Sequence, residues 1–221
     1  FLKGCNMRCK YCHNPDTWAK TEGEMKSAEE ILQQALRYKR YWGKKGGITV
    51  SGGEALLQID FVTELFTLAK EKGVNTCLDT SGNPFTREEP FYSKFEKLME
   101  VTDLFMLDIK EIDEDEHKQL TGQTNKNILD MATCLSDHGK AMWIRHVLVP
   151  GITDDDGQLH RLRAFIDTLK TVERVEILPY HTLGVFKWKE LGIPYALEDV
   201  EPPTKEQVEH AREIIIPDYK S

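Results

Sequence analysis

Short apolar segments alternate with longer amphipathic segments along most of the chain. The apolar segments predict β-strands at 47–51, 74–79, 103–110, 141–149 and 175–178. The longer segments place apolar residues three or four positions apart, which predicts helices near 28–43, 59–72, 88–100, 113–120, 125–138 and 155–170, and a last helix from 204. Strands that alternate with helices are typical of a parallel sheet covered by helices.

The first residues add part of another strand. Phe1-Leu2 is apolar and the cysteine-rich segment follows at once, so we expect the end of a strand whose N-terminal segment is missing from this sequence. Five strands and this stub make six, too few for a closed eight-unit barrel. The expected fold is one α/β domain over 1–221, a partial, laterally open (β/α)6 TIM-like barrel of parallel strands with right-handed crossovers.

Composition narrows the protein classes. The 221 residues are 40% hydrophobic, which suits one globular domain with a core. The net charge of −8 argues against nucleic-acid binding. No apolar run approaches the roughly 18 residues of a membrane span, so no membrane partner is expected. The five cysteines are an odd number and no export signal is apparent, which favours a reducing cytoplasm.

Three cysteines lie close together near the start. Cys5, Cys9 and Cys12 have the spacing C-x3-C-x2-C. Three thiolates can hold three irons of a cubane cluster and leave the fourth iron open to a substrate. Two alternatives remain, a Cys3His zinc site completed by His13 and thiols without a shared function. The other two cysteines, 77 and 134, lie in apolar patterns, and we expect both in the core.

Polar residues gather where the predicted strands end, which is where barrels of this type carry their chemistry. They are Ser51-Gly52-Gly53-Glu54, Asp79-Thr80, Asp108-Ile109-Lys110, Arg145-His146 and Pro179-Tyr180-His181. Each has an ordinary structural explanation, such as a helix cap or an ion pair. Their shared position, beside the cysteine segment, favours one site. Two adjacent glycines in that set allow the backbone to approach a ligand closely, although such a pair is often only a turn.

Together these residues resemble the radical S-adenosylmethionine superfamily, through Cys5, Cys9, Tyr11 and Cys12 followed by Gly52-Gly53-Glu54. Within it, the chain resembles the glycyl-radical-enzyme activases. That narrower resemblance is carried by Cys12–Trp18, Ser51–Ala55, Cys77–Gly82, Met106–Lys110, Trp143–Arg145, Val149–Gly151 and Leu178–His181. It covers essentially the whole chain. The chain departs from the superfamily pattern at Ala55, where proline is usual, and lacks the family's N-terminal segment.

The resemblance implies an activity. A [4Fe-4S] cluster is expected to bind S-adenosylmethionine and cleave it with one electron, and the 5′-deoxyadenosyl radical to remove a Cα hydrogen from a glycine of a partner enzyme. The implied partner is a glycyl radical enzyme, with pyruvate formate-lyase expected first. The implied electron donor is flavodoxin or ferredoxin. Two other functions stay open: a radical S-adenosylmethionine enzyme acting on a small molecule, and a non-catalytic zinc or cluster-binding module.

The resemblance also assigns residues. The cluster ligands are Cys5, Cys9 and Cys12, and Lys110 joins them as catalytic. The cofactor-binding set is Tyr11, Cys12, His13, Gly52, Gly53, Glu54, Asp108, Ile109, Lys110, Arg145 and His181. In that set the Gly-Gly-Glu motif receives the methionyl amino end, and His181 closes on the adenosyl side. A candidate Na⁺ or K⁺ site comprises Asp79, Thr80, Met106 and Asp108. Asn14 is expected to contact the partner.

Overall fold

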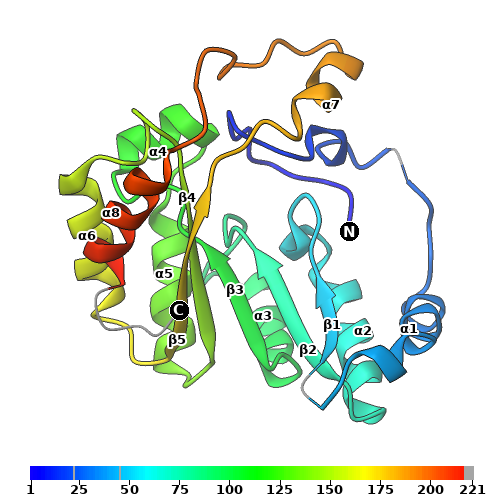
Figure 1. The fold of residues 1–221 in the computed structure, drawn as a ribbon. Helices are drawn as coiled ribbons and strands as arrows, with labels where there is room; N and C mark the ends of the chain where they lie inside the picture. The colour runs from blue at the N-terminus through cyan, green and yellow to red at the C-terminus, as the bar shows by residue number, and fades with distance from the viewer. Residues whose placement is uncertain (22, 45, 217–221) are drawn as a thin grey trace.

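The computed structural model describes residues 1–21, 23–44 and 46–216. Within them, one sheet of parallel strands runs in chain order: β1 (Gly47–Val50), β2 (Asn75–Thr80), β3 (Leu104–Asp108), β4 (Met142–Leu148) and β5 (Val172–Pro179). Figure 1 shows the strands as a curved fan with helices over its outer surface. β1 and β5 form its two edges. The prediction of a parallel, laterally open α/β barrel is confirmed.

The expected sixth strand is reduced to one residue. Leu2 forms an isolated parallel bridge with Gly52 just beyond β1. The Leu2 amide donates to the Ser51 carbonyl at 2.8 Å, and the Gly53 amide donates to the Leu2 carbonyl at 2.9 Å. The count of six strands is therefore wrong for the described residues, where five strands and one bridge are found.

The helices follow the predicted order with one addition. They are α1 (Ala28–Leu36), α2 (Ile59–Glu71), α3 (Phe91–Glu100), α4 (Glu114–Thr121), α5 (Lys126–Asp137), α6 (Asp156–Ile166), α7 (Val185–Glu190) and α8 (Lys205–Ile215). Short 3-10 turns are η1 (Pro15–Thr17), η2 (Lys39–Tyr41) and η3 (Ala55–Gln58). A capping box between Ser27 and Glu30 starts α1, which ends before Gly43. The six-residue α7 was not predicted. In the described part of the chain, no helix is both long and apolar enough to span a membrane.

Strand alternation separates a helix-covered face from a concave face. In β4, Ile144 and His146 are buried, whereas Arg145 is half-buried on the opposite face. The same alternation places Asp79 of β2 and Asp108 of β3 on the concave face. Parallel register sets Asp108 beside Arg145, so charged side chains from three neighbouring strands gather there.

The alternation also corrects one expectation about the cysteines. Cys134 of α5 is fully buried, as predicted. Cys77 of β2 is only half-buried, because it shares the concave face with Asp79. The prediction that it belongs to the core is wrong.

Candidate functional site

A cavity of about 450 Å³ opens at the carboxyl ends of the strands. It is bounded by the cysteine loop, defined here as residues 4–18, and by the ends of the strands. The predicted site residues that line it are Cys5, Cys9, Tyr11, Cys12, His13, Asn14, Gly52, Gly53, Asp79, Thr80, Asp108, Lys110, Arg145 and His181. Glu54, Met106 and Ile109 are not among its lining residues in the described chain.

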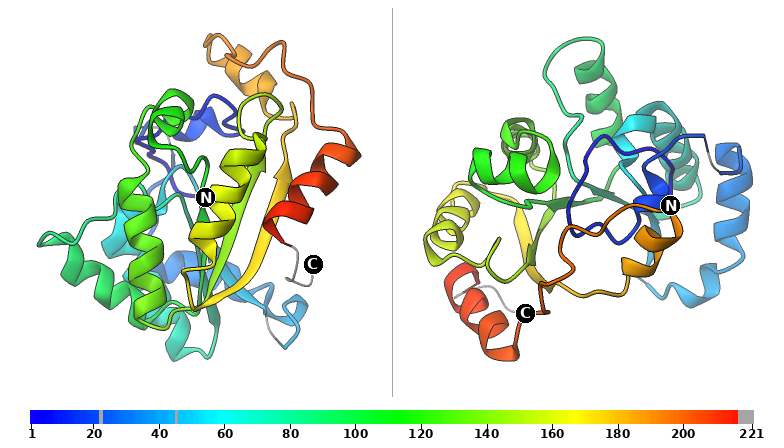
Figure 2. Two further views of the ribbon diagram at one scale, coloured as in Figure 1. Left: turned by 90° about the vertical axis from the view of Figure 1, so that its left-hand side faces the viewer. Right: turned by 90° about the horizontal axis from the view of Figure 1, so that it is seen from above.

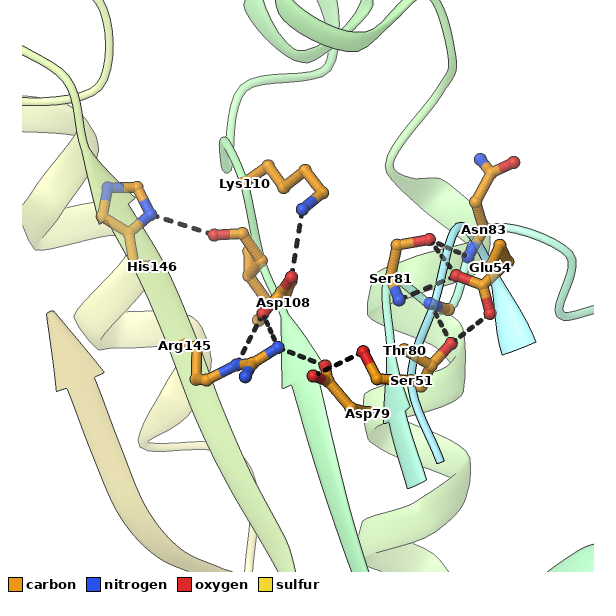
Figure 3. Close-up of polar contacts among 12 residues, drawn as sticks. Ser51, Glu54, Asp79, Thr80, Ser81, Asn83, Asp108, Lys110, Arg145 and His146 are labelled. Carbon is orange, nitrogen blue, oxygen red and sulfur yellow. Dashed lines mark hydrogen bonds and ion pairs between the residues drawn. The ribbon is translucent and has the colours of Figure 1, made fainter. Parts of the chain in front are cut away.

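Four charges form a row along the cavity floor, which we call the charged row: Asp79, Arg145, Asp108 and Lys110 (Figure 3). Arg145 bridges the carboxylates, with Nε donating to Asp108 Oδ1 at 2.8 Å and Nη2 donating to Asp79 Oδ1. Lys110 Nζ donates to Asp108 Oδ2 at 3.1 Å. Ser51 Oγ donates to Asp79 Oδ2 at 3.0 Å. Two cations and two carboxylates therefore compensate one another.

Mutual pairing sets the protonation of the charged row. Burial acts to raise the pKa of Asp108, but the Lys110 and Arg145 cations outweigh it and hold that pKa below its usual value. Burial and the neighbouring Asp108 carboxylate raise the pKa of Asp79. Burial acts to lower the pKa of Lys110, yet Asp108 raises it well above its ordinary value. The two cations thus stay charged near neutral pH and can pair with the carboxylate of an amino-acid ligand.

Glu54 does not line the cavity, and its carboxylate is directed at Thr80 and Ser81 (Figure 3). Its side chain is buried, and Oε1 accepts from the Leu56 amide at 2.9 Å and from Thr80 Oγ1 at 2.5 Å. Oε2 accepts from the Ser81 amide at 2.9 Å and from Ser81 Oγ. Burial raises the pKa of Glu54 despite these donors. The structure does not bring this carboxylate to the cofactor cavity. It joins the Gly52-Gly53 turn to the end of β2 instead.

The two glycines are required by the protein's own backbone. A Cβ on Gly52 would lie 2.3 Å from the Leu2 carbonyl oxygen, and one on Gly53 would lie 2.4 Å from the Gly4 carbonyl oxygen. The Glu54 amide also donates to the Gly4 carbonyl at 2.7 Å. The close approach expected from the sequence is therefore made by residues 2–4, and it fixes where the cysteine loop begins.

The three loop cysteines share the cavity, and all three thiols are free. Burial raises the pKa of each thiol, and that of Cys9 to about 12. The loop is hydrogen-bonded to the end of α4. The Arg8 amide donates to the Thr121 carbonyl at 2.8 Å, and the Lys10 amide donates to the Leu120 carbonyl at 3.0 Å. Binding iron as thiolates must therefore release protons.

The donor set fits a [4Fe-4S] cluster, because Cys5, Cys9 and Cys12 would supply one thiolate to each of three irons, and the charged row lines the same cavity. Across the described residues, no three His, Cys, Asp or Glu side chains come together to hold a single metal ion. The candidate Na⁺ or K⁺ site stays a prediction, and in this structure its side-chain oxygens are already engaged by other residues. Arg145 lies between Asp79 and Asp108, and the Thr80 hydroxyl donates to Glu54.

Two histidines, His13 and His181, also line the cavity. The His13 and His181 rings stack with centroids 3.9 Å apart and an interplanar angle of 12°. Burial and the neighbouring His181 lower the pKa of His13. Asn14 Oδ1 already accepts from Lys187 Nζ at 2.7 Å, and its contact with a partner stays a prediction. The sequence did not predict Lys187 and Trp188 as site residues. Neither belongs to a motif, and only their contacts with the cysteine loop identify them.

Comparisons with known proteins agree with this geometry. The model of the Radical SAM superfamily matches residues 1–162. A pyruvate formate-lyase-activating enzyme from Streptococcus mutans is 57% identical over 217 residues, covering 97% of this chain and 82% of that protein. One from Listeria monocytogenes is 50% identical over 216 residues, covering 97% and 87%.

Solved structures support the fold. A domain of pyruvate-formate lyase-activating enzyme from Bacteroides vulgatus superposes with a TM-score of 0.63 at 22% identity, covering 79% of this chain and 94% of that one. Streptococcus suis SuiB bound to precursor peptide SuiA gives 0.69 at 16% identity, covering 98% and 45%. At these identities the likeness concerns the fold alone. Taken with the family match and the relatives at 50–57% identity, the chain belongs to the radical SAM superfamily and, within it, to the pyruvate formate-lyase-activating enzymes.

Proposed function

We propose that this protein installs the glycyl radical on pyruvate formate-lyase by removing one Cα hydrogen from a glycine of that enzyme. The observation that carries the proposal is one cavity that combines three free cysteine thiols with the cations Lys110 and Arg145. When bound, the cluster and S-adenosylmethionine supply a 5′-deoxyadenosyl radical by one-electron cleavage, and this radical accepts the hydrogen. The names of the curated relatives point to the same partner.

In this proposal the residues of the chain bind the cluster and S-adenosylmethionine and set their orientation. Cys5, Cys9 and Cys12 hold the cluster, and the charged row binds the amino-acid end of S-adenosylmethionine. Lys110 Nζ is 3.1 Å from Asp108, so the carboxylate partner keeps the ammonium aimed into the cavity. The ion pairs within the row hold its side chains in place without a contribution from the ligand. A preorganised binding site of this kind costs little reorganisation during the reaction.

The open side of the sheet suits a protein substrate. β1 and β5 do not pair with each other, so the barrel is not sealed laterally. An extended glycine-bearing loop can enter there and cross the cavity mouth near Asn14. We assign the electron donor as flavodoxin or ferredoxin. We also place the protein in the cytoplasm, since five free thiols suit a reducing compartment.

Transfer of deuterium tests the proposal. The protein is reconstituted anaerobically with iron and sulfide, then incubated with reductant, S-adenosylmethionine and a glycine-loop peptide deuterated at the glycine Cα. Deuterium is expected in 5′-deoxyadenosine, slowly for the peptide because it must be ordered on binding, and faster for intact pyruvate formate-lyase. The proposal fails if neither protein nor peptide gives transfer while a small metabolite does, since that result supports a small-molecule enzyme.

A further inference from the structure

The segment after β5, which includes α7, lies beside the cysteine loop and contacts it (Figures 1 and 2). Lys187 Nζ donates to Asn14 Oδ1 at 2.7 Å and to Asp16 Oδ1 at 2.9 Å. Trp188 Nε1 donates to the Cys12 carbonyl at 2.8 Å. These contacts join residues 171 to 176 positions apart in the sequence, so they link the last strand of the open barrel to the loop that follows its first residues.

Packing makes this contact specific. Trp188 is 4% exposed and meets Trp18 edge-on, with ring centroids 5.1 Å apart. On its other side Trp188 packs on Tyr195 at 5.2 Å, and the Tyr195 hydroxyl is 2.8 Å from that of Tyr180 just beyond β5. The indole is therefore held between the loop and the end of the strand, with its N–H fixed on the Cys12 carbonyl.

The turn before α7 fits closely against the loop. A Cβ on Gly184 would lie 2.7 Å from the Cα of His13, so this turn tolerates no side chain without moving. Cys12 is thus held at its carbonyl by the Trp188 indole, and the next residue, His13, is packed against Gly184.

We propose that Lys187 and Trp188 form a latch that positions Cys12–Asp16, and with it the third cluster ligand. The inference rests on the proposed function only in taking Cys12 as a cluster ligand. Groups that hydrogen-bond around metal ligands orient them and tune the metal they hold. Lys187 and Trp188 are accordingly positioning residues, and neither is required to touch the cluster.

The first half of the loop has separate anchors. The Arg8 guanidinium donates to the Cys5 carbonyl at 2.8 Å, and the Arg8 amide is bound to α4. The Gly4 carbonyl is bound by the Glu54 amide. Loss of the latch should therefore release Cys12 and leave Cys5 in place, a pattern that general loosening of the fold would not give.

The test uses the protein without its cluster and its five free cysteines as internal probes. Trp188→Phe keeps an aromatic ring and removes the donor, whereas Lys187→Met keeps the length and removes the charge. Each variant is treated with iodoacetamide, and the alkylation rate of every cysteine is followed by peptide mass spectrometry. We expect the rate at Cys12 to rise about tenfold, the effect of losing one hydrogen bond. The rates at Cys5, Cys77 and Cys134 should stay unchanged.

Two controls make the outcome specific. Trp42→Phe makes the same chemical change at a half-buried tryptophan beside η2 and should alter no rate. Lys187→Arg retains a cation for Asn14 and Asp16 and should restore the low rate at Cys12. In the reconstituted protein, Trp188→Phe should also shift the midpoint potential of the cluster while iron content stays the same.

The latch is refuted if Cys12 reacts at the wild-type rate in both variants, or if Cys77 and Cys134 become reactive together with Cys12. If Trp188→Phe does not fold, the lysine variants decide the question alone, since Lys187 is partly exposed. Because alkylation is measured without a cluster, a negative result in the deuterium experiment does not affect this test. Failure of the latch and failure of the proposed function are therefore distinguishable.

Discussion

The charged row and the cysteine loop face the same cavity but are built in opposite ways. The row stands on three adjacent strands, and sheet register alone places Asp108 beside Arg145. The loop has little regular structure and takes its shape from α4, from residues 52–54 and from α7. Neighbouring strands thus supply a preformed binding surface, whereas the conformation of the metal-binding loop depends on contacts with segments far away in the sequence.

The two regions should also respond differently to substitution. Each charge of the row is compensated by another, so removing one leaves a partly buried partner unpaired, which is costly. A protonated loop thiol carries no charge, so removing one costs a metal ligand and leaves no charged partner unpaired. The following variants test this contrast, from the largest expected effect to the smallest.

Cys9→Ala should abolish cluster binding, because two thiolates on this loop cannot hold a cubane cluster. Iron and sulfide content after anaerobic reconstitution measures the effect, and the melting temperature of the protein without its cluster should barely change. Cys134→Ala is the control, since that buried thiol is on α5, outside the lining of the cavity. A full cluster in Cys9→Ala would mean that the ligands are assigned wrongly.

Lys110→Ala should weaken S-adenosylmethionine binding by about tenfold to a hundredfold, the worth of a charge-assisted hydrogen bond of roughly 1.5–3 kcal/mol. Cluster content should stay normal. An anaerobic titration of the reconstituted protein gives the affinity. Lys94→Ala, which breaks a surface ion pair with Asp60, is the matched control. Equal affinities for the two variants would mean that Lys110 does not bind S-adenosylmethionine.

Glu54→Gln tests the residue that connects the two regions. The Glu54 amide binds the Gly4 carbonyl of the cysteine loop, and its carboxylate binds Thr80 and Ser81 at the end of β2. The amide places a donor against the Ser81 amide and hydroxyl, so we expect the free energy of unfolding to fall by about 1–3 kcal/mol. Chemical denaturation measures it, with exposed Glu64→Gln as the control. A loss of S-adenosylmethionine affinity without any loss of stability would instead mean that Glu54 contacts the cofactor.

The last test concerns Glu111, whose effect on stability is visible as a pH dependence. Burial raises the pKa of Glu111 from 4.5 to about 7, and among the described residues its Oε2 has no hydrogen-bond partner. A carboxyl group with a higher pKa in the folded state stabilises the fold when protonated. Its contribution is complete below about pH 4.5 and is lost as the pH rises through 7. Glu111→Gln should therefore gain stability relative to wild type between pH 5 and pH 8, on the order of 2 kcal/mol. Parallel stability curves for the two proteins would contradict this assignment.

The sequence predicted the strand-borne region far better than the loop-borne one. Apolar runs located all five strands to within a few residues, and their polar ends led to Asp79, Asp108 and Arg145. The donors that enclose the Glu54 carboxylate could not be predicted, because one carboxylate at a strand end looks like another in the sequence. The latch was not predicted, because α7 has only six residues and shows no clear helical periodicity. The hydrogen bond from Trp188 to the Cys12 carbonyl also depends on no particular residue type at position 12, so the sequence around neither residue indicates it.

The long sequence separation within the latch has a consequence for how the protein is made. The cysteine loop is synthesised among the first described residues, but Trp188 follows Cys12 by 176 residues. At about 5–20 residues per second, roughly 9–35 s of translation separate the two. During that interval the thiols are on a nascent chain without their final support. Delivery of iron and sulfide is therefore expected to be productive only after Trp188 has been synthesised and has folded against the loop.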